Sequence, residues 1–346
     1  MRVGNNSRKF ASILVIMALF APYVLIGFTP THVQAQSTSG TIVFDMSHGQ
    51  YSDFIFTGQD AELQFWLEAK GYEVIWAFGG INDTILASAE GLIIGSIYGD
   101  EYTFSDAEVQ AISDWFNPGN KFLWIGADSD FSGAYINANM SKILTAVGSH
   151  VYPEQCSVED PVSNCEAPYR PVATGYSDAE FVENITADVN ATLFHGPTCL
   201  YGATGGAEGA GPVDLRTTSI PNVYIVSQYS ENAKIVNPDD VPPVAHTVDT
   251  TGDFVAMTVE VMAGSHQAGI IAVSGASPYG DYQPMFNSEY YNVTLNGFKL
   301  VRQAIDWGMQ LAPTYEPVPP LNLIPIIGII GAVVVIVIMI GFIMKK

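Results

Sequence analysis

Polar side chains suited to acid–base or nucleophilic chemistry recur where apolar runs of this sequence end. Four such ends carry Asp45, Ser47, His48, Ser96, Tyr98, Asp128, Ser129, Ser274 and Ser277. If the runs are neighbouring parallel strands, these residues meet at the carboxyl edge of the sheet, where open α/β sheets bind ligands. An Asp/His/Ser set gathered there can bind a small polar ligand or a metal ion, or activate a water molecule. The candidate catalytic residues are therefore Asp45, His48, Asp128 and Ser129, and the candidate ligand-binding residues are Ser47, His48, Ser96, Asp128 and Ser277.

The same residues also have a purely structural interpretation. Asp45 and His48 can satisfy backbone groups of their own loop, and Asp128 and Ser129 can cap the helix that follows them. Ser129 lacks the Gly-x-Ser-x-Gly surroundings of a hydrolase nucleophile, because acidic residues flank it on both sides. Both interpretations stay open at this point.

The three cysteines point to a disulfide rather than to a metal site. Cys156 and Cys165 bracket a short polar loop, and an exported location favours a bridge between them. Cys199 is left as a free thiol, either buried or reactive, and His195 either shares a pocket with it or lies buried in a turn. No spacing of potential ligands suits zinc or calcium, so we expect neither a metal nor a cofactor.

Strands and helices alternate through the first half of the chain, and they position these strand ends. The predicted strands are 41–47, 72–78, 91–97 and 121–127, and the predicted helices are 60–70, a short one from 83, 105–116 and 134–147. Ser105 and Glu108 form a capping box at the start of one helix. Because the strands are apolar on both faces, they predict an α/β fold with a doubly wound, mostly parallel sheet of flavodoxin-like type, covered by helices on both sides.

The second half of the chain is less regular and richer in strand-like runs. These runs lie at 223–228, 254–261 and 269–274, before an amphipathic helix at 293–310. We therefore expect one extracytoplasmic domain over 36–311, made of the α/β sheet and a β-rich C-terminal extension.

Two uncharged apolar runs, 10–28 and 323–344, bracket a body that holds all 35 acidic residues. The first run follows a basic start and precedes a small-residue cleavage site, which predicts a signal peptide over 1–35; an uncleaved anchor is the alternative. The second run predicts a transmembrane helix, with a Pro-rich stalk at 312–322 before it and two cytoplasmic lysines at 345–346 after it. The expected location is the cell membrane, in a single-pass type I topology with the body outside.

The acidic charge of the chain narrows the choice of partners. A net charge of −22 argues against nucleic acid and anionic lipid surfaces, which would repel it. An exported body is also open to glycosylation, and the acceptor pattern occurs at Asn82, Asn139, Asn184, Asn190 and Asn292. Tyr-rich loops at 277–286 and 288–291 offer rings for a sugar or a partner protein, although exposed tyrosines are also frequent on extracellular loops.

Several short motifs of the body resemble one known family. They are Asp45–Gln50, Gly91–Ser96, Phe104–Gly119, Lys121–Asp130 and Gly269–Ser277. Together they resemble the class I glutamine amidotransferase-like fold, in its non-amidotransferase branch. That branch includes uncharacterised membrane-tethered domains and the N-terminal domains of gliding-motility and intraflagellar-transport components.

The catalytic residues of true amidotransferases are missing from these motifs. The turn that carries the nucleophilic cysteine in that family holds Asp128 here, and neither His195 nor His266 begins a His-x-Glu pattern. The resemblance therefore implies a catalytically degenerate domain. We expect a membrane-anchored module that binds a small polar ligand or a surface protein, within a transport or cell-surface assembly. The alternative is an extracytoplasmic hydrolase that uses the strand-end Asp, His and Ser residues.

Overall fold

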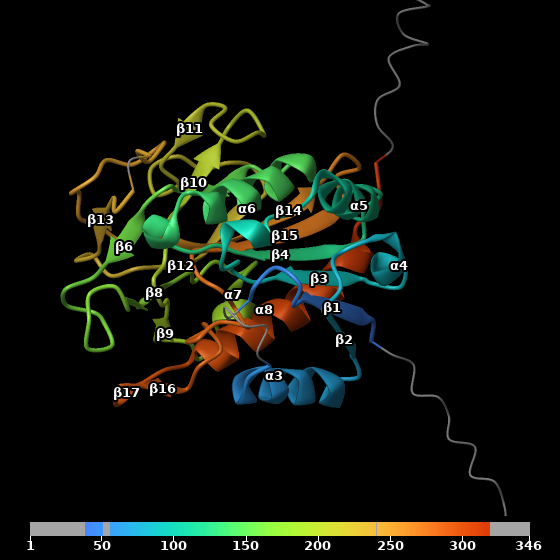
Figure 1. Ribbon diagram of the computed structural model, residues 1–346, viewed down its shortest axis with the longest axis horizontal. Coiled ribbons are helices and arrows are strands. Elements are labelled where there is room, and N and C mark those ends of the chain that lie inside the picture. Colours follow the sequence, from blue (N-terminus) through green and yellow to red (C-terminus); the bar gives the residue numbers. More distant parts are fainter. Residues whose placement is uncertain (1–38, 51–55, 240, 319–346) are drawn as a thin grey trace, which may run out of the picture. The chain divides into compact units, whose positions relative to one another are not determined.

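An eight-stranded sheet forms the centre of the computed structural model, which describes residues 39–50, 56–239 and 241–318 (Figure 1). In sheet order the strands are β2 (Glu73–Ala77), β1 (Thr41–Asp45), β3 (Gly91–Ile94), β4 (Phe122–Gly126), β15 (Gly269–Ser274), β14 (Val255–Ala263), β12 (Val223–Gln228) and β8 (Gly175–Tyr176). The first five strands run parallel to one another. The last three are each antiparallel to the strand before them in this order.

Helices cover both faces of the sheet (Figure 1). One face carries α4 (Asp83–Leu86), α5 (Asp106–Phe116) and α6 (Tyr135–Ala146), and the other carries α3 (Gly58–Ala69), the short α7 (Glu183–Thr186) and α8 (Gly297–Leu311). Strand β4 contributes side chains to the cores on both faces of the sheet, because successive side chains of a strand point to opposite faces. Phe122 and Trp124 belong to the core with α3 and α8, whereas Leu123 and Ile125 belong to the core with α5 and α6. All five residues of β4 are buried, as expected of a central parallel strand.

Side-chain caps fix where two of the surface helices begin. The Ser105 hydroxyl of α5 accepts a hydrogen bond from the Glu108 amide, and the Glu108 carboxylate accepts one from the Ser105 amide. This is the predicted capping box, and it satisfies two amides that the first turn of a helix leaves free. Thr57 and Asp60 form a second capping box at the start of α3.

Short strands and turns make up the rest of the described chain. They form a three-stranded sheet and three two-stranded ribbons: β11 (Pro212–Val213) with β10 (Leu200–Ala203) and β5 (Val151–Pro153), β13 (Lys234–Val236) with β6 (Ser157–Glu159), β16 (Glu289–Tyr290) with β17 (Val293–Thr294), and β7 (Val172–Ala173) with β9 (Thr192–Leu193). Three short 3₁₀ turns complete the described elements: η1 (Asp100–Tyr102), η2 (Asp130–Ser132) and η3 (Ala312–Thr314).

The predicted fold class was wrong about the second half of the chain. The strands of the second half do not form a separate extension, because β12, β14 and β15 continue the central sheet and β15 lies between β4 and β14. Hydrophobic periodicity reveals a strand but not its neighbour, so the sequence did not show this insertion. The predicted fold also included a transmembrane helix at 323–344, which lies outside the described residues. No helix of the described residues is both long enough and apolar enough to cross a membrane.

Several sequence-based predictions concern segments outside the residues that the structure describes. The signal peptide at 1–35, the apolar run at 323–344 and the tail at 345–346 lie outside the described residues. Of the predicted stalk, residues 312–318 are described, and they contact the domain. The Asn120 side-chain amide donates to the Tyr315 carbonyl at 2.7 Å, and the Val318 amide donates to the His266 carbonyl at 2.8 Å.

The predicted disulfide between Cys156 and Cys165 is not formed. Both thiols are free and buried, as is that of Cys199. Cys165 packs in a small cluster with Val172, Leu193 and Leu295, whereas the other two cysteines belong to the main core under the sheet. Closeness along the sequence therefore gave the wrong partner, because the chain between Cys156 and Cys165 carries them into different clusters.

Candidate functional site

The carboxyl ends of β1, β3, β4 and β15 carry the predicted site residues, but the structure divides these residues into two groups. One group lies around His48 after β1. The other surrounds a cavity of about 580 Å³, called the acid pocket here. The described residues that line it are Tyr98, Asp128, Ser129, Phe131, Ser157, Val158, Glu159, Tyr169, His195, Gly196, Val236, Pro238, Asp281 and Tyr282.

His48 links β1 to α5 through two carboxylates. Its Nδ1 lies 2.7 Å from Asp45 Oδ2, its Nε2 lies 3.2 Å from Glu108 Oε1, and its ring stacks on Phe104. Burial opposes the charged ring, but the hydrogen bonds and charges of Asp45 and Glu108 outweigh it and raise the pKa of His48. Since both ring nitrogens are engaged, His48 has no free nitrogen with which to take a proton from a substrate.

Asp45 holds the loop after β1 together. Its Oδ1 accepts hydrogen bonds from the Ser47 amide at 3.0 Å and from the Ser47 hydroxyl at 2.5 Å. Its Oδ2 accepts a further bond from the Gln50 side chain at 3.0 Å. Asp45, Ser47 and His48 thus satisfy one another, and none of them lines the acid pocket.

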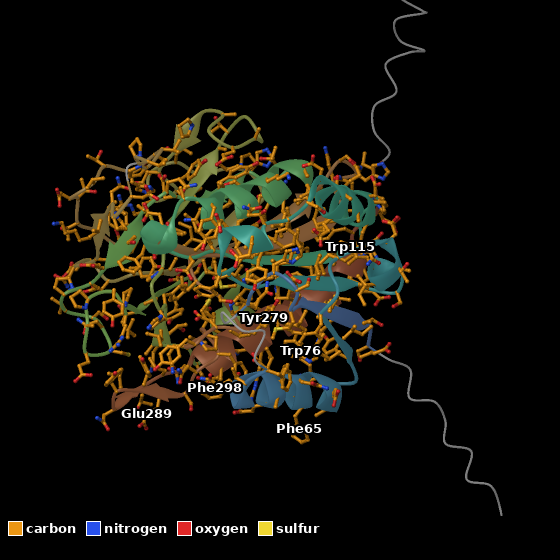
Figure 2. All side chains as sticks on the ribbon, viewed as in Figure 1. Phe65, Trp76, Trp115, Tyr279, Glu289 and Phe298 are labelled. Carbon is orange, nitrogen blue, oxygen red and sulfur yellow. The ribbon has the colours of Figure 1, made fainter. Side chains whose placement is uncertain are left out.

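The two predicted ligand-binding serines, Ser96 and Ser277, fasten the loops that build the pocket. The buried Ser96 hydroxyl donates to the Ala127 carbonyl at 2.6 Å, and the Ser277 hydroxyl accepts from the Ser96 amide at 3.1 Å. Tyr279, which is labelled in Figure 2, completes this junction. Its hydroxyl lies 2.6 Å from the Asp45 carbonyl. These bonds join the loops after β1, β3, β4 and β15, so they position the pocket residues without facing the cavity themselves.

The floor of the acid pocket holds two buried carboxyl groups, Asp128 and Asp281. Asp128 is 7% exposed and Asp281 is 2% exposed. The Tyr98 hydroxyl donates to Asp128 Oδ2 at 2.8 Å and also hydrogen-bonds Asp281. Burial raises the pKa of Asp281 to about 6, and burial together with the charge of Asp281 raises the pKa of Asp128 well above its usual value. The two acids are electrostatically coupled, so ionisation of one disfavours ionisation of the other.

One carboxylate oxygen of Asp281, a residue that lines the pocket, is unpaired. Among the described residues, its Oδ2 is buried and has no hydrogen-bond partner. A buried carboxylate oxygen without a hydrogen-bond donor destabilises the fold. A ligand bound in the cavity could supply the missing donor. The sequence interpretation omitted Asp281. The sequence feature that could have pointed to Asp281 was its place in the loop after β15, because the loop after β4 carries Asp128.

Ser129 has the structural role that was the alternative interpretation. Its amide donates to Asp128 Oδ1 at 2.6 Å and to the Gly196 carbonyl at 2.8 Å. Its hydroxyl accepts from the Phe131 amide at 3.4 Å, at the start of the turn η2. Within the described parts of the chain, no histidine hydrogen-bonds this hydroxyl, so Ser129 lacks the base that would activate a nucleophile.

His195 lines the pocket as a neutral ring. Burial, aided by the positive charge of Arg170, lowers the pKa of His195 to about 4. Its ring lies edge-on to Tyr169 and Tyr282, with centroids 5.9 Å away in both cases. Cys199 does not line the pocket, so the cavity does not bring His195 and this thiol together.

Aromatic rings form the outer wall of the acid pocket. Phe131 is 81% exposed, Tyr282 is 54% exposed and Tyr169 is 44% exposed, so their faces remain accessible at the mouth. The described lining also includes Glu159 but neither Lys nor Arg. Because His195 is neutral, the lining itself presents acidic groups and aromatic rings, and Arg170 supplies a positive charge next to it, with its guanidinium 4.8 Å from the centroid of the Tyr169 ring.

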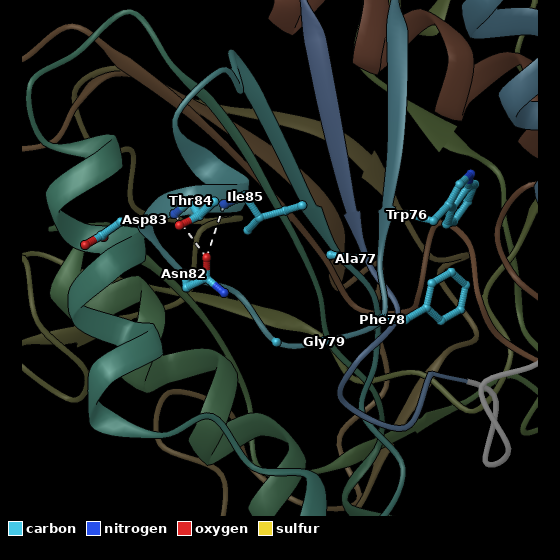
Figure 3. Close-up of a pocket in the computed structure, with 9 residues that line it drawn as sticks. Trp76, Ala77, Phe78, Gly79, Asn82, Asp83, Thr84 and Ile85 are labelled. Atoms are coloured by element: carbon cyan, nitrogen blue, oxygen red, sulfur yellow. Dashed lines mark hydrogen bonds between the residues drawn. The ribbon is translucent and has the colours of Figure 1, made fainter.

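A second hollow, of about 650 Å³, shows no comparable chemistry (Figure 3). One continuous stretch, residues 76–85, forms it. Its polar side chain Asn82 is engaged as the cap of α4, where it accepts from the Thr84 and Ile85 amides at 3.0 and 3.2 Å. We therefore place the candidate site in the smaller acid pocket.

The remaining site predictions concern metals and glycans. The described residues contain no group of three His, Cys, Asp or Glu side chains placed to hold a metal ion. Four of the five glycan acceptors are exposed, namely Asn82, Asn184, Asn190 and Asn292. Asn139 is half-buried, and its amide nitrogen donates to the Tyr135 carbonyl at 2.8 Å. The exposed positions are therefore the accessible ones, and glycosylation itself stays a prediction.

No protein-family model matches this chain, and neither does any curated protein. Solved structures with a similar fold include the mmIFT52 N-terminal domain, which is 13% identical with a TM-score of 0.49, over 80% of this chain and 98% of that one. A protein from Bacteroides uniformis described as ThuA-like is 10% identical with a TM-score of 0.37, over 82% of this chain and 95% of its own. A Thermoplasma acidophilum protein described as part of a GMP synthase is 10% identical with a TM-score of 0.37, over 80% and 96% of the two chains. The structural neighbours thus include proteins of the kind that the motifs resemble, and nothing about activity follows from them.

Proposed function

We propose that this domain binds a small, positively charged organic molecule, such as an amine, in the acid pocket. The observation that carries the proposal is the buried Oδ2 of Asp281, which has no partner among the described residues and belongs to a side chain that lines the cavity together with Asp128. An ammonium group donates up to three hydrogen bonds and carries the charge that two neighbouring carboxylates need.

The raised pKa values of Asp128 and Asp281 favour a cation over a neutral ligand. Burial disfavours the state in which both Asp128 and Asp281 are ionised. A bound cation would remove that penalty by allowing both groups to ionise. Sugar hydroxyls would donate hydrogen bonds but would leave the negative charge uncompensated.

The aromatic wall supports the same ligand class. Phe131 and Tyr282 expose ring surface among the residues that line the pocket, and the Tyr169 ring already stacks with one cation, the Arg170 guanidinium, at 4.8 Å. Cations are attracted to such faces by about 0.5–2 kcal/mol per ring. A cavity of about 580 Å³ also lies within the usual size range of small-molecule sites.

Binding is favoured over hydrolysis because the pocket lacks an activated nucleophile among its described residues. The Ser129 hydroxyl accepts a backbone hydrogen bond, and the His48 ring is held by two carboxylates outside the cavity. The location outside the cytoplasm and any partner protein remain predictions from the sequence.

Isothermal titration calorimetry of the purified full-length chain tests the proposal. We expect putrescine to bind, and glucose to bind at least about tenfold more weakly, since the diamine alone supplies positive charge together with ammonium N–H donors. Asp281→Asn and Asp128→Asn should each lower the amine affinity by about tenfold or more. Asp178→Asn, at an exposed aspartate that does not line the pocket, is the matched control and should leave affinity unchanged.

The proton count gives a second and independent readout. Because Asp281 has a pKa of about 6, amine binding at pH 6 should release protons to the buffer, which calorimetry detects by comparing two buffers of different ionisation enthalpy. Binding of glucose in preference to the amine, or amine binding that both Asn variants leave intact, would refute the proposal.

A further inference from the structure

The thiols of Cys156 and Cys199 lie against each other in the core. Their sulfur atoms are 3.8 Å apart, and both residues are fully buried. The two cysteines are 43 positions apart in the sequence, so this contact is a product of the fold. The Thr198 hydroxyl lies 3.5 Å from the Cys156 sulfur and completes a small polar contact around the pair.

Backbone hydrogen bonds hold the two segments side by side around this contact. The Glu154 amide donates to the Cys199 carbonyl at 2.9 Å, and the Val158 amide donates to the Pro197 carbonyl at 2.8 Å. Cys156 therefore lies between Glu154 and Val158, and the segment that faces it runs from Pro197 to Cys199. The sulfur separation of 3.8 Å is larger than the roughly 2 Å of a disulfide bond, so forming the bond requires the two side chains to close this gap.

We infer that Cys156 and Cys199 form a disulfide when the protein folds under oxidising conditions. The bond would join the two segments that carry one wall of the acid pocket. Ser157 and Val158 directly follow Cys156, and Gly196 lies three positions before Cys199; all three line the cavity. The disulfide would therefore fix the wall of the pocket while staying outside the cavity itself.

The oxidant in this reaction is a disulfide-containing reagent or exchange partner, such as oxidised glutathione. One cysteine thiolate attacks the reagent disulfide, forms a mixed disulfide and releases one reduced thiol. The second cysteine thiolate then attacks the mixed disulfide, closes the internal bond and releases the second reduced thiol. Two electrons pass from the protein to the reagent, and the two protons of the cysteine thiols leave with them. Burial raises the pKa of the Cys199 thiol, and both thiols are shielded from solvent in the folded protein, so the exchange belongs to folding rather than to the finished structure.

Two other roles for these cysteines fit the structure less well. Cys165 lies in a separate cluster and is no candidate partner for either thiol. The Cys199 sulfur also lies 4.0 Å from His246 Nδ1, which in turn is 2.8 Å from Glu154 Oε1. That arrangement resembles a nucleophile with its base, but Cys199 is fully buried and lines no described cavity, so no substrate can reach it.

Peptide mapping of the full-length chain tests the inference. The protein is refolded with reduced and oxidised glutathione, free thiols are alkylated in denaturant, and the digest is examined by mass spectrometry without reduction. We expect one linked peptide pair that contains Cys156 and Cys199, with Cys165 alkylated. A link that contains Cys165, or alkylation of all three cysteines, would overturn the inference.

Variants and thermal unfolding extend the same test. Cys165→Ser is the matched control and should retain the linked pair, whereas Cys156→Ser and Cys199→Ser should lose it. Reduction of the linked wild-type protein should lower its Tm by about 5–10 °C, since closing a loop of this length restricts the unfolded chain. Because the mapping uses the wild-type chain, it decides the pairing even where a serine variant fails to fold.

Discussion

The hydroxyl of Tyr98 donates a hydrogen bond to Asp128 Oδ2 at 2.8 Å, across the gap between the loops that follow β3 and β4. This bond stabilises the ionised form of Asp128 and so works against the rise in its pKa that burial causes. The same hydroxyl hydrogen-bonds Asp281, so one phenol sets the protonation of both acids.

Removing this phenol should destabilise the fold and weaken ligand binding together. Tyr98→Phe leaves a buried carboxyl without its donor, which should lower the free energy of unfolding by about 1–2 kcal/mol near pH 7. Urea denaturation measures this change. Tyr224→Phe is the control, because no described residue hydrogen-bonds the Tyr224 hydroxyl, and it should stay within about 0.5 kcal/mol of wild type. Equal effects of the two variants would contradict the role given to Tyr98.

Replacing Asp281 with asparagine should stabilise the protein at neutral pH. The pKa of Asp281 rises from an unfolded value of 3.8 to about 6, so its protonated form favours folding. That contribution is complete below about pH 4 and is lost as the pH rises through about 6. Asp281→Asn should therefore exceed wild type by about 2 kcal/mol near pH 7 and match it near pH 4. Denaturation curves at the two pH values provide the test, and a pH-independent difference would argue against it.

Glu108 should control part of the loss of stability at alkaline pH. The pKa of His48 is raised above its unfolded value of 6.5, so the charged ring contributes stability that is present below pH 6.5 and lost as the pH rises through the folded value. Glu108→Gln keeps an oxygen for the capping box but removes one charge beside His48. The loss of unfolding free energy between pH 6 and pH 9 should be smaller in this variant. The difference curve against wild type isolates His48 from His150, whose pKa Glu260 also raises.

His195 should titrate far below His48 and His150, whose carboxylate partners raise their pKa values. Burial and the Arg170 charge lower its pKa to about 4, so the ring should remain neutral at pH 6. NMR titration of the histidine ring carbons measures this directly. Arg170→Gln should move the midpoint upward by less than the full shift, because burial remains. Lys142→Gln, which removes a cation that pairs with Asp106, is the control and should leave the midpoint in place.

The sequence predicted local elements well because their signals are local. Strands β1 and β4 lie inside the predicted apolar runs, and the Ser105–Glu108 capping box is confirmed. Strand-end polarity also led to Asp128, which does line a cavity. In each case, residues within a few positions of one another carry the information.

The features that the sequence missed all depend on pairing over long distances. Whether Asp45 or Asp281 joins Asp128 depends on how the loops after β1 and β15 bend, and hydrophobic pattern contains no information about that. The sequence placed Cys156 with its near neighbour Cys165, whereas the fold brings it to Cys199. In the sequence, His48 is next to polar residues of its own loop. That Glu108 pairs with its second ring nitrogen follows only from the position of α5 in the fold.

The position of β15 has a consequence for biosynthesis. This strand is made near the end of the domain, yet it separates β4 from β14 at the middle of the sheet. While the ribosome is still synthesising the preceding residues, β4 has an open edge that can pair with other chains, and the loop that supplies Asp281 does not yet exist. A nascent chain should thus stay dependent on protection from aggregation until Gly269–Ser274 has emerged, and the acid pocket should be among the last parts of the molecule to form.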